Sequence, residues 1–519
     1  MKLLLPTCLS SALLAAVCCL SSAVTWAAPP PAIRFMVNRF SIEGAAPLTV
    51  QALERYFQPL QQRQYTLKEL QDVSKGLEAL LRDANLPFYS VILPPQTLDA
   101  GTVKFLIKPV ALGEVTVQGN HYFSKDNIVA SLPNLQQGKP PVPGDLSQAV
   151  KVANKHPAKQ VQVTFKAGAK AEQVDAKINV KDLRPYQATL NLNTVGTKST
   201  GNFRLIGALQ YSNLWGLDHI VNASYTTSPD HADTVKQYGG SYSLPLYGLK
   251  GWLSAYYAYS NVNAGTIASD LTVTGSGEMY GIHYQQFLPK WGAYEQWLDI
   301  GLDNRDFVSD IRFQNVPIGT HVRSVPFSIQ YKAEYPWRNA RFGYQAQWAG
   351  NTQLGDHNSA TDYTAVRSGA SPEWNVLRYG ANMGINLQQW QLQTIFIAQY
   401  TSNSLISGEQ LGIGGSYDIR GYQERETSAD RGEIVKIEAT TPTWQHVNLF
   451  VFYDYGHGVL QSYTPGQRRD WSLSSTGVGA AWQWQQNLQA KVAYADALDD
   501  AVSTRAGDGR IHASIILRY

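Results

Sequence analysis

The chain has 519 residues, and 43 Lys and Arg against 40 Asp and Glu leave a net charge of only +3. That charge is too small for this length to argue for a nucleic-acid ligand, and the length exceeds one ordinary domain, although barrels of several hundred residues exist as single units. With 29 Tyr, 13 Trp and 42 Gly but only 4 Met, the composition is typical of a β-rich protein.

Residues 1–27 have the pattern of a secretory signal peptide. Lys2 supplies the positive charge, residues 3–23 are apolar or small, and cleavage is expected after Ala27. All three cysteines (Cys8, Cys18, Cys19) lie in this segment, so the mature chain has no thiol for a disulfide or a metal site. No later stretch has the apolar length of a membrane helix, so insertion into a membrane would require a closed β-barrel.

Residues 33–110 have a mixed α and β pattern. A first strand is expected near residues 35–42 and a short helix near 50–57. Thr66 and Glu69 form a capping box that opens a longer helix. Two further strands, near residues 89–93 and 102–107, complete the order β-α-α-β-β.

The same order recurs in residues 111–182. Ser124 can cap a short helix over residues 125–131, and a weaker helix is expected over 145–154. Strands are expected at residues 160–165 and 174–180, where apolar and polar residues alternate. Two such units in succession resemble polypeptide-transport-associated (POTRA) domains, and the alternative is a pair of generic α+β modules.

From residue 185 to residue 519 the helical spacing disappears and a period of two replaces it. At ~10 residues per spanning strand plus turns, this length allows about 16 antiparallel strands. In the last strand one face is apolar, and its members are Ile511, Ala513, Ile515, Leu517 and Tyr519, while Arg510 and His512 lie on the polar face. A soluble sandwich also alternates, but one apolar and one polar face per strand favours a barrel with lipid outside and water inside.

Aromatic residues at strand ends are candidates for a girdle at the membrane interface. They are Trp252, Tyr256, Tyr257, Tyr259, Trp482 and Trp484. The short segments 213–216 and 245–248 are expected as turns at one end of the barrel. The longer polar segments 227–233 and 304–315 are expected as loops at the other end.

Two motifs in this region offer an Arg–carboxylate pair. The first is a glycine-rich loop with Gly414, Gly415, Ile419, Arg420, Gly421 and Tyr422; the second is a strand-like segment with Phe452, Asp454 and Gly456. Glycine accepts positive φ and so allows a sharply folded loop. A guanidinium binds a carboxylate with two parallel hydrogen bonds. Taken alone, such a pair is weak evidence, because surface ion pairs usually contribute little.

Together, the export signal, the two POTRA-like units and the C-terminal barrel resemble the two-partner secretion transporters (TpsB), the outer-membrane pores for haemolysins and filamentous haemagglutinins. The resemblance covers essentially the whole mature chain and implies that loop six, at about residues 403–432, folds back into the lumen and pairs Arg420 with Asp454. Two residues depart from the family pattern: Ile419 replaces the usual Val, and Asp418 adds a carboxylate that could compete for Arg420. Residues 28–32 are too short and proline-rich for the helix that plugs some members.

The resemblance also implies a function: an unfolded, TpsA-like exoprotein docks on the POTRA domains in the periplasm and passes through the barrel. The candidate docking edge carries Gln160, Gln162 and Thr164, because an extended peptide can pair with an exposed strand. The partner stays open between haemolysin, adhesin and contact-dependent toxin. Expected contacts include outer-membrane lipids and, during insertion, the barrel-assembly machinery.

The chain is expected to be monomeric, to bind no nucleic acid, metal or other cofactor, and to catalyse no reaction. No catalytic constellation, phosphate-binding loop or metal-ligand spacing is apparent in the sequence. Two alternatives remain. A barrel-assembly insertase shares both motifs but usually carries more POTRA domains, and a passive porin or adhesin would have no use for residues 33–182.

Overall fold

The computed structural model describes residues 33–519, except residues 171, 198–199, 263–264, 269–270, 274–275, 309–311, 314–315 and 318–319. The predicted signal peptide and residues 28–32 therefore lie outside the described part. The chain forms two compact units: the first runs to Ala84 and includes Tyr89–Lys108, and the second comprises Asn85–Phe88 and Pro109–Tyr519. Among the described residues, no helix is both long and apolar enough to cross a membrane.

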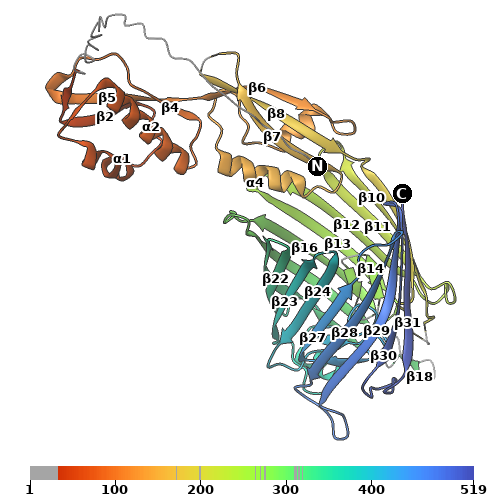
Figure 1. Cartoon of the computed structure of the whole chain (residues 1–519). Helices are drawn as coiled ribbons and strands as arrows, with labels where there is room; N and C mark the ends of the chain where they lie inside the picture. Colours follow the sequence, from red (N-terminus) through yellow and green to blue (C-terminus); the bar gives the residue numbers. More distant parts are fainter. Residues whose placement is uncertain are drawn as a thin grey trace, which may run out of the picture. The chain divides into compact units, whose positions relative to one another are not determined.

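The first unit is a three-stranded sheet with two helices on one face (Figure 1). The sheet order is β2 (Arg39–Gly44), β5 (Thr102–Pro109), β4 (Tyr89–Ile92), and the helices are α1 (Val50–Phe57) and α2 (Leu67–Asp83). Thr66 caps α2 through the predicted capping box. The predicted first strand is divided into β1 (Phe35–Val37) and β2, and β1 pairs with β3 (Arg63–Tyr65), a short strand that the sequence did not predict. Stacked Phe40, Phe57 and Phe105 join α1 to the sheet.

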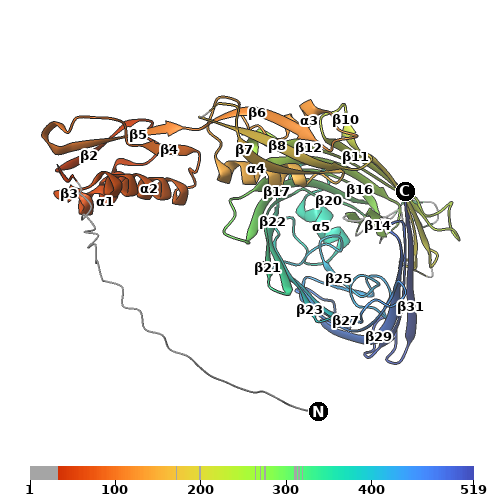
Figure 2. The same ribbon diagram turned by 45° about the horizontal axis from the view of Figure 1, so that its top comes forward.

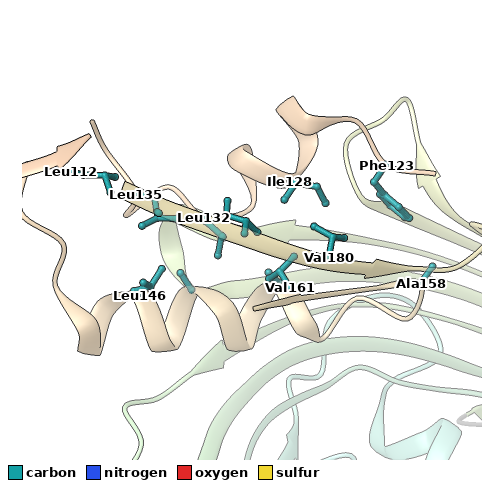
Figure 3. Close-up of a cluster of buried hydrophobic side chains, with 13 residues drawn as sticks. Leu112, Phe123, Ile128, Leu132, Leu135, Leu146, Ala158, Val161 and Val180 are labelled. Carbon is teal, nitrogen blue, oxygen red and sulfur yellow. The ribbon is translucent and has the colours of Figure 1, made fainter. Parts of the chain in front are cut away.

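The second unit begins with another α+β module. Its elements are β6 (Ala111–Gln118), α3 (Lys125–Ala130), α4 (Pro143–Asn154), β7 (Lys159–Ala167) and β8 (Gln173–Asp182), which is the predicted β-α-α-β-β order. The sheet order β6-β8-β7 places β8 in the centre and β7 at an edge. Figure 3 shows the core, in which Ile128 and Leu132 from the α3 region and Leu146 from α4 pack with Val161 and Val180 of the sheet.

The rest of the chain is a closed antiparallel barrel. Over the described residues the ring has 16 strands, because β20 and β21 both pair with β17 and act as one interrupted strand. In chain order the strands are β9 (Tyr186–Asn193), β10 (Arg204–Leu214), β11 (His219–Thr227), β12 (Gln237–Leu246), β13 (Gly251–Ser260), β16 (Gly277–Phe287), β17 (Glu295–Val308), β20 (His321–Ser324), β21 (Pro326–Trp337), β22 (Ala340–Asn351), β23 (Asn375–Leu387), β24 (Trp390–Tyr400), β27 (Arg431–Thr440), β28 (Val447–Val459), β29 (Asp470–Trp484), β30 (Leu488–Ala497) and β31 (Gly509–Arg518).

The last strand, β31, closes the ring on β9, with Ser514 opposite Asn193 and Arg518 opposite Thr189. Ile511, Ile515, Leu517 and Tyr519 are exposed on the outer surface, Ala513 on the same face is half-buried, and His512 is buried on the inner side. The alternation predicted for this strand therefore matches its two faces. The fold class predicted from the sequence, two α+β units followed by a barrel of about 16 strands, is confirmed.

Two of the predicted girdle aromatics do not face outward. Trp252 is only 6% exposed and packs against the α+β module, where its indole N–H donates to the Val152 carbonyl oxygen of α4 at 3.4 Å. The Tyr256 hydroxyl donates to Asp303 Oδ1 inside the barrel at 2.8 Å. Tyr257 and Trp484 are exposed, and Tyr259 and Trp482 are half-buried. The presence of an aromatic residue in a strand does not by itself show that its side chain faces the lipid, because aromatic side chains also point into the lumen or pack against the α+β module.

The connections differ at the two ends of the barrel. At the end next to the α+β module they are short, as at the predicted turns 213–216 and 245–248. The longer ones lie at the other end and include the hairpins β14–β15 (Gly265–Ala268, Leu271–Val273) and β18–β19 (Arg312–Phe313, Val316–Pro317). Residues 304–308 belong to β17 and β20 begins at His321, so the loop predicted at 304–315 begins later in the chain than expected. Loop six, residues 401–430, enters the ring with β25 (Leu411–Ile413) and β26 (Thr427–Ala429), and α5 (Ala360–Val366) also lies inside the ring (Figure 2).

Candidate functional site in the barrel lumen

Loop six folds into a compact unit because its glycines adopt conformations that other residues avoid. Gly414 and Gly415 have φ of +108° and +118°. A side chain at Gly414 would meet the Gln423 carbonyl oxygen at 2.8 Å, so the close approach also requires glycine. The Gly415 N–H donates to the Ile419 carbonyl oxygen at 3.0 Å. This tight turn presents the side chain of Arg420 to the barrel wall.

Arg420 binds Asp454 of β28 with one edge of its guanidinium, formed by Nε and Nη2. Nε lies 2.6 Å from Asp454 Oδ2 and Nη2 lies 2.8 Å from Oδ1, while the Arg420 backbone N–H donates to Oδ2 at 3.2 Å. Arg420 is 5% exposed and Asp454 is fully buried. Charge-assisted, bidentate hydrogen bonds of this kind are among the strongest in proteins. The structure therefore joins the two predicted motifs at their charged residues.

A second carboxylate, Glu438 of β27, completes the Arg420 site and was missed in the sequence. Arg420 Nη1 donates to Glu438 Oε2 at 2.6 Å. Asp418, the expected competitor, does not form a hydrogen bond or ion pair with Arg420 in the described structure, where Arg420 instead contacts Asp454 and Glu438. The register pairs Glu438 with Phe452 and Lys436 with Asp454. The sequence signal that could have revealed Glu438 is the alternation of positive and negative residues along β27, the strand before the Asp454 motif.

The remaining motif residues pack around this ion pair. The Arg420 guanidinium lies 3.4 Å from the centre of the Phe452 ring, a cation–π contact. A side chain at Gly456 would meet Ile419 Cδ1 at 2.3 Å, so this glycine makes room for the loop. Tyr422 is fully buried, and its hydroxyl accepts a hydrogen bond from the Asp499 N–H at 3.0 Å. Gly421 has φ of +94°, which turns the chain between the two side chains.

His512 of the last strand also holds loop six. Its Nε2 accepts a hydrogen bond from the Gly421 N–H at 3.0 Å, and its Nδ1 lies 2.8 Å from Ser416 Oγ. Ser416 Oγ lies 2.8 Å from Glu424 Oε1 and donates to it. Because one ring nitrogen accepts from a backbone N–H, the imidazole fits this site in its neutral form. The sequence placed His512 on the polar face but gave no sign of this role.

The predicted docking edge, β7, is an edge strand, but its outward hydrogen-bonding groups belong to other residues than expected. Asn154 of α4 bonds to both the N–H and the C=O of Val161, at 2.6 and 3.0 Å. Backbone groups alternate along a strand, so Val163 and Phe165 also direct theirs to the free edge. Gln160, Gln162 and Thr164 expose their side chains, while their backbone groups face β8.

A groove of about 1130 Å³ runs beside this edge. Val150 and Lys151 of α4 and Val163 and Phe165 of β7 line one side. The barrel rim lines the other with Phe287, Lys290, Glu295, Trp297 and Glu334. Lys151 Nζ lies 3.3 Å from Glu295 and over the rings of Phe287 and Trp297. The groove combines apolar walls with charged ends at the mouth of the barrel.

The α+β module is joined to the barrel by a buried polar cluster. Lys159 Nζ lies 2.5 Å from Asp218 Oδ2 and 2.9 Å from Asn127 Oδ1, and Asn127 also donates to Asp218 at 2.9 Å. The Tyr247 hydroxyl donates to the same Asp218 oxygen. Burial lowers the pKa of Lys159, and the adjacent Asp218 opposes that shift. Asp218 lies in the turn between β10 and β11, so the cluster fixes the module on the barrel rim.

Within the part of the chain that the structure describes, no group of three or more His, Cys, Asp or Glu residues is placed to hold a metal ion. Several charged residues of the lumen are instead paired with one another, as Arg420 is with Asp454 and Glu438.

Comparison with known proteins identifies the family. Residues 173–482 match the family described as haemolysin secretion/activation protein ShlB/FhaC/HecB, and residues 35–109 match the ShlB-type POTRA domain. The chain belongs to this haemolysin secretion/activation family. Its members are outer-membrane pores for two-partner secretion, so the protein is an outer-membrane β-barrel transporter whose POTRA domains lie in the periplasm.

Individual relatives are distant in sequence, but the matches extend over most of the chain. The heme/hemopexin transporter protein HuxB of Haemophilus influenzae (strain 86-028NP) is 21% identical over 464 residues, which cover 85% of this chain and 79% of HuxB. The outer membrane transporter CdiB-2 of Burkholderia pseudomallei (strain 1026b) is 22% identical over 405 residues, or 74% of this chain and 66% of CdiB-2.

Solved structures share the fold. CdiB from Escherichia coli superposes with a TM-score of 0.75 at 16% identity and covers 96% of this chain and 92% of its own. BamA from Haemophilus ducreyi, in a form lacking POTRA domains 1–3, gives a TM-score of 0.50 at 12% identity, with 93% and 100% covered. The family match therefore favours a secretion pore over the barrel-assembly insertase that the sequence left open.

Proposed function

We propose that this transporter receives an unfolded exoprotein at the β7 edge and passes it through a lumen that loop six closes at rest. The observation that carries the proposal is the groove of about 1130 Å³ between β7, α4 and the barrel rim. An extended segment paired with the edge would gain main-chain hydrogen bonds, and its alternate side chains would face the apolar groove wall. The same segment would then lie at the barrel mouth.

We further propose the division of labour along the chain. Residues 33–110 form POTRA domain 1, residues 111–182 form POTRA domain 2, and residues 185–519 form the barrel, preceded by a signal peptide at 1–27. Gly414, Gly415, Ile419, Arg420, Gly421 and Tyr422 hold loop six in the lumen against Phe452, Asp454 and Gly456. The strand with Ile511, Ala513, Ile515, Leu517 and Tyr519 presents its outer face to lipid and is the segment that the barrel-assembly machinery receives.

The proposed partner is a TpsA-like exoprotein of the haemolysin, adhesin or contact-dependent toxin class. The family description, haemolysin secretion/activation protein, supports a polypeptide partner rather than a small solute. The pore acts as a monomer, without a cofactor or a catalytic step. Folding of the partner outside the cell supplies the free energy for transport. A gene for a large, repetitive exported protein beside that of the transporter would identify the partner.

The edge is tested by removing one outward N–H group. Val163→Pro deletes an N–H that faces the groove and leaves the β8 ladder intact, whereas Val163→Ala shortens the side chain but keeps the N–H. Each variant is co-expressed with the exoprotein partner, and the amount of exoprotein secreted into the medium is measured. We expect Val163→Pro to lose most secretion and Val163→Ala to retain it. Equal secretion by the two variants, with equal barrel levels in the membrane, would refute docking at this edge.

A further inference from the structure

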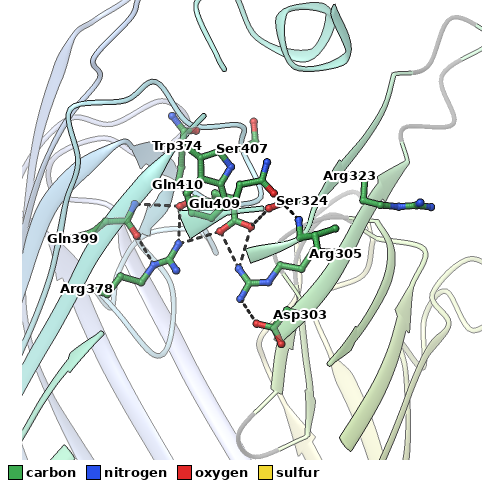
Figure 4. A network of polar contacts seen from close by, with 12 residues as sticks. Asp303, Arg305, Arg323, Ser324, Trp374, Arg378, Gln399, Ser407, Glu409 and Gln410 are labelled. Carbon is green, nitrogen blue, oxygen red and sulfur yellow. Dashed lines mark hydrogen bonds and ion pairs between the residues drawn. The ribbon is translucent and has the colours of Figure 1, made fainter. Parts of the chain in front are cut away.

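Loop six has a second buried attachment, at Glu409, well before the Arg420 motif. The carboxylate accepts hydrogen bonds from Arg305 Nη1 at 2.9 Å, Arg378 Nη2 at 3.1 Å and Ser324 Oγ at 3.0 Å (Figure 4). Glu409 is 1% exposed. Gln399 Nε2 also donates to the Glu409 carbonyl oxygen at 3.1 Å, so both the side chain and the backbone of this residue are fixed.

The partners of Glu409 lie on a different part of the wall from those of Arg420. Arg305 is on β17, Ser324 on β20 and Arg378 on β23. Counted from β9, β17, β20 and β23 belong to the seventh, eighth and tenth strands of the ring, whereas β27 and β28, which carry Glu438 and Asp454, are the twelfth and thirteenth. β31, whose His512 accepts from the Gly421 N–H, is the sixteenth, so in a ring of 16 it lies nearly opposite β17. Loop six is therefore attached to both sides of the barrel and crosses the lumen between them.

The charges of this network balance only when Glu409 is present. Arg305 also pairs with Asp303, at 2.9 Å. The described polar contacts of Arg378 are with Gln399 and with the carbonyl and carboxylate of Glu409, so Glu409 supplies the carboxylate in that set. Removing one partner of a buried ion pair leaves the other charge uncompensated, which is strongly unfavourable. A variant without the Glu409 carboxylate would relieve that cost by moving loop six or by admitting water to the arginines.

We propose that Glu409 is a second positioning residue for loop six, and that the closed pore requires this attachment in addition to the one at Arg420. The inference rests on the proposed closure of the lumen by loop six. Arg420 fixes the tip of the loop, and Glu409 fixes the limb that leaves β24. With Glu409 released, the crossing segment loses its hold on the β17–β23 side while the tip remains bound to Asp454.

The test measures channel activity of purified protein in planar lipid bilayers. Glu409→Gln keeps the size of the side chain and removes its charge, and we expect the open probability to rise about tenfold, as for a typical coupling between sites. Glu433→Gln is the matched control, because Glu433 lies on the same barrel in a half-buried pair with His457. Glu409→Asp should restore closure in part, since a shorter carboxylate can still bind one arginine.

A covalent cross-link between residues 324 and 409 tests the attachment of loop six independently of the charge of Glu409. The sequence has no cysteine after Cys19, so Ser324→Cys with Glu409→Cys adds the only two thiols of the mature chain. The reduced double variant should conduct like Glu409→Gln, and bridging the thiols with a short bis-methanethiosulfonate should close it. Conductance unchanged from wild type in Glu409→Gln, or unaltered by bridging, would overturn the role of Glu409.

Arg420→Ala, measured in parallel, distinguishes failure of the proposed role of Glu409 from failure of the proposed closure by loop six. If Arg420→Ala opens the channel and Glu409→Gln does not, only the inference about Glu409 fails. If neither variant opens it, closure by loop six is wrong as well, and the inference about Glu409 falls with it.

Discussion

At the scale of single residues, the Arg420–Asp454 pair shows how burial changes the value of an ion pair. An exposed pair is worth about 0.2–1 kcal/mol, whereas removing one partner of a buried pair costs ~3–5 kcal/mol. In a water-filled barrel such a pair would be partly hydrated, and its value would fall between these two limits. The structure buries both side chains and adds Glu438, so Arg420 belongs near the upper end of that range.

Arg420→Ala should therefore release the tip of loop six, because it leaves Asp454 and Glu438 close together without their cation. We expect the barrel to insert and to remain heat-modifiable on gels, since the wall is held by its own ladders of hydrogen bonds, while secretion of the partner falls strongly. Arg420→Lys should recover only part of it, because an ammonium cannot make the bidentate contact. Normal secretion by both Arg420→Ala and Asp454→Ala would show that the pair is mere packing.

The result of exchanging the charges of Arg420 and Asp454 should depend on Glu438. In the double variant Arg420→Asp with Asp454→Arg, the new carboxylate faces Glu438, so we expect poor secretion. Adding Glu438→Gln removes that repulsion and should restore secretion above the level of the double variant. Secretion assays of the double and triple variants side by side check this, and equal loss in both would argue against direct pairing.

His156, in the second POTRA domain, predicts a pH dependence. Burial lowers its pKa below the ordinary 6.5. Its Nδ1 accepts from the Ala158 N–H at 3.2 Å, and its Nε2 bonds to the Ser212 carbonyl oxygen of β10 at 2.5 Å. The unfolded state then binds the proton more tightly, so this contribution to stability is complete above pH 6.5 and is lost as pH falls below it.

The contact between the domain and the barrel should consequently loosen at about pH 5.5 relative to about pH 7.5. Hydrogen exchange of residues 156–161 in detergent-solubilised protein measures this loosening. In His156→Gln, which keeps a donor for Ser212 but does not titrate, the difference between the two pH values should shrink. The same pH difference in wild type and His156→Gln would assign the effect to other groups.

At the scale of elements, the turn between β10 and β11 carries the joint between POTRA domain 2 and the barrel. Asp218→Asn keeps the shape of the turn, because Asn tolerates the positive φ of 63° found there. It leaves Lys159 buried without a carboxylate, and we expect it to weaken the joint by ~3–5 kcal/mol.

The neutral pair Lys159→Met with Asp218→Asn should be milder than Asp218→Asn alone, because no charge is left uncompensated. Limited proteolysis of POTRA domain 2 in detergent measures the three proteins together. If the double variant is cut as fast as the single one, specific polar contacts rather than charge balance hold the joint.

At the scale of the whole molecule, the topology fixes the orientation in the membrane. The POTRA domain and the short turns lie at one end of the barrel, and the long connections lie at the other. Protease added to spheroplasts should remove residues 33–182 and leave a protected, heat-modifiable barrel. Intact cells should lose neither domain, and cleavage of the POTRA domains in intact cells would reverse the orientation.

The sequence by itself determined the architecture, because periodicity depends only on neighbouring residues. A period of two in β31 and helical spacing with a capping box at Thr66 identified the elements, and the resemblance of two short motifs to the TpsB family pointed to the pair of Arg420 and Asp454. Tertiary structure alone decided which groups meet across the ring. Glu409 with Arg305 and Arg378, Arg420 with Glu438, and His512 with Gly421 come from strands that only barrel closure brings together. Burial in that lumen, which no local pattern reports, sets the strength of each pair.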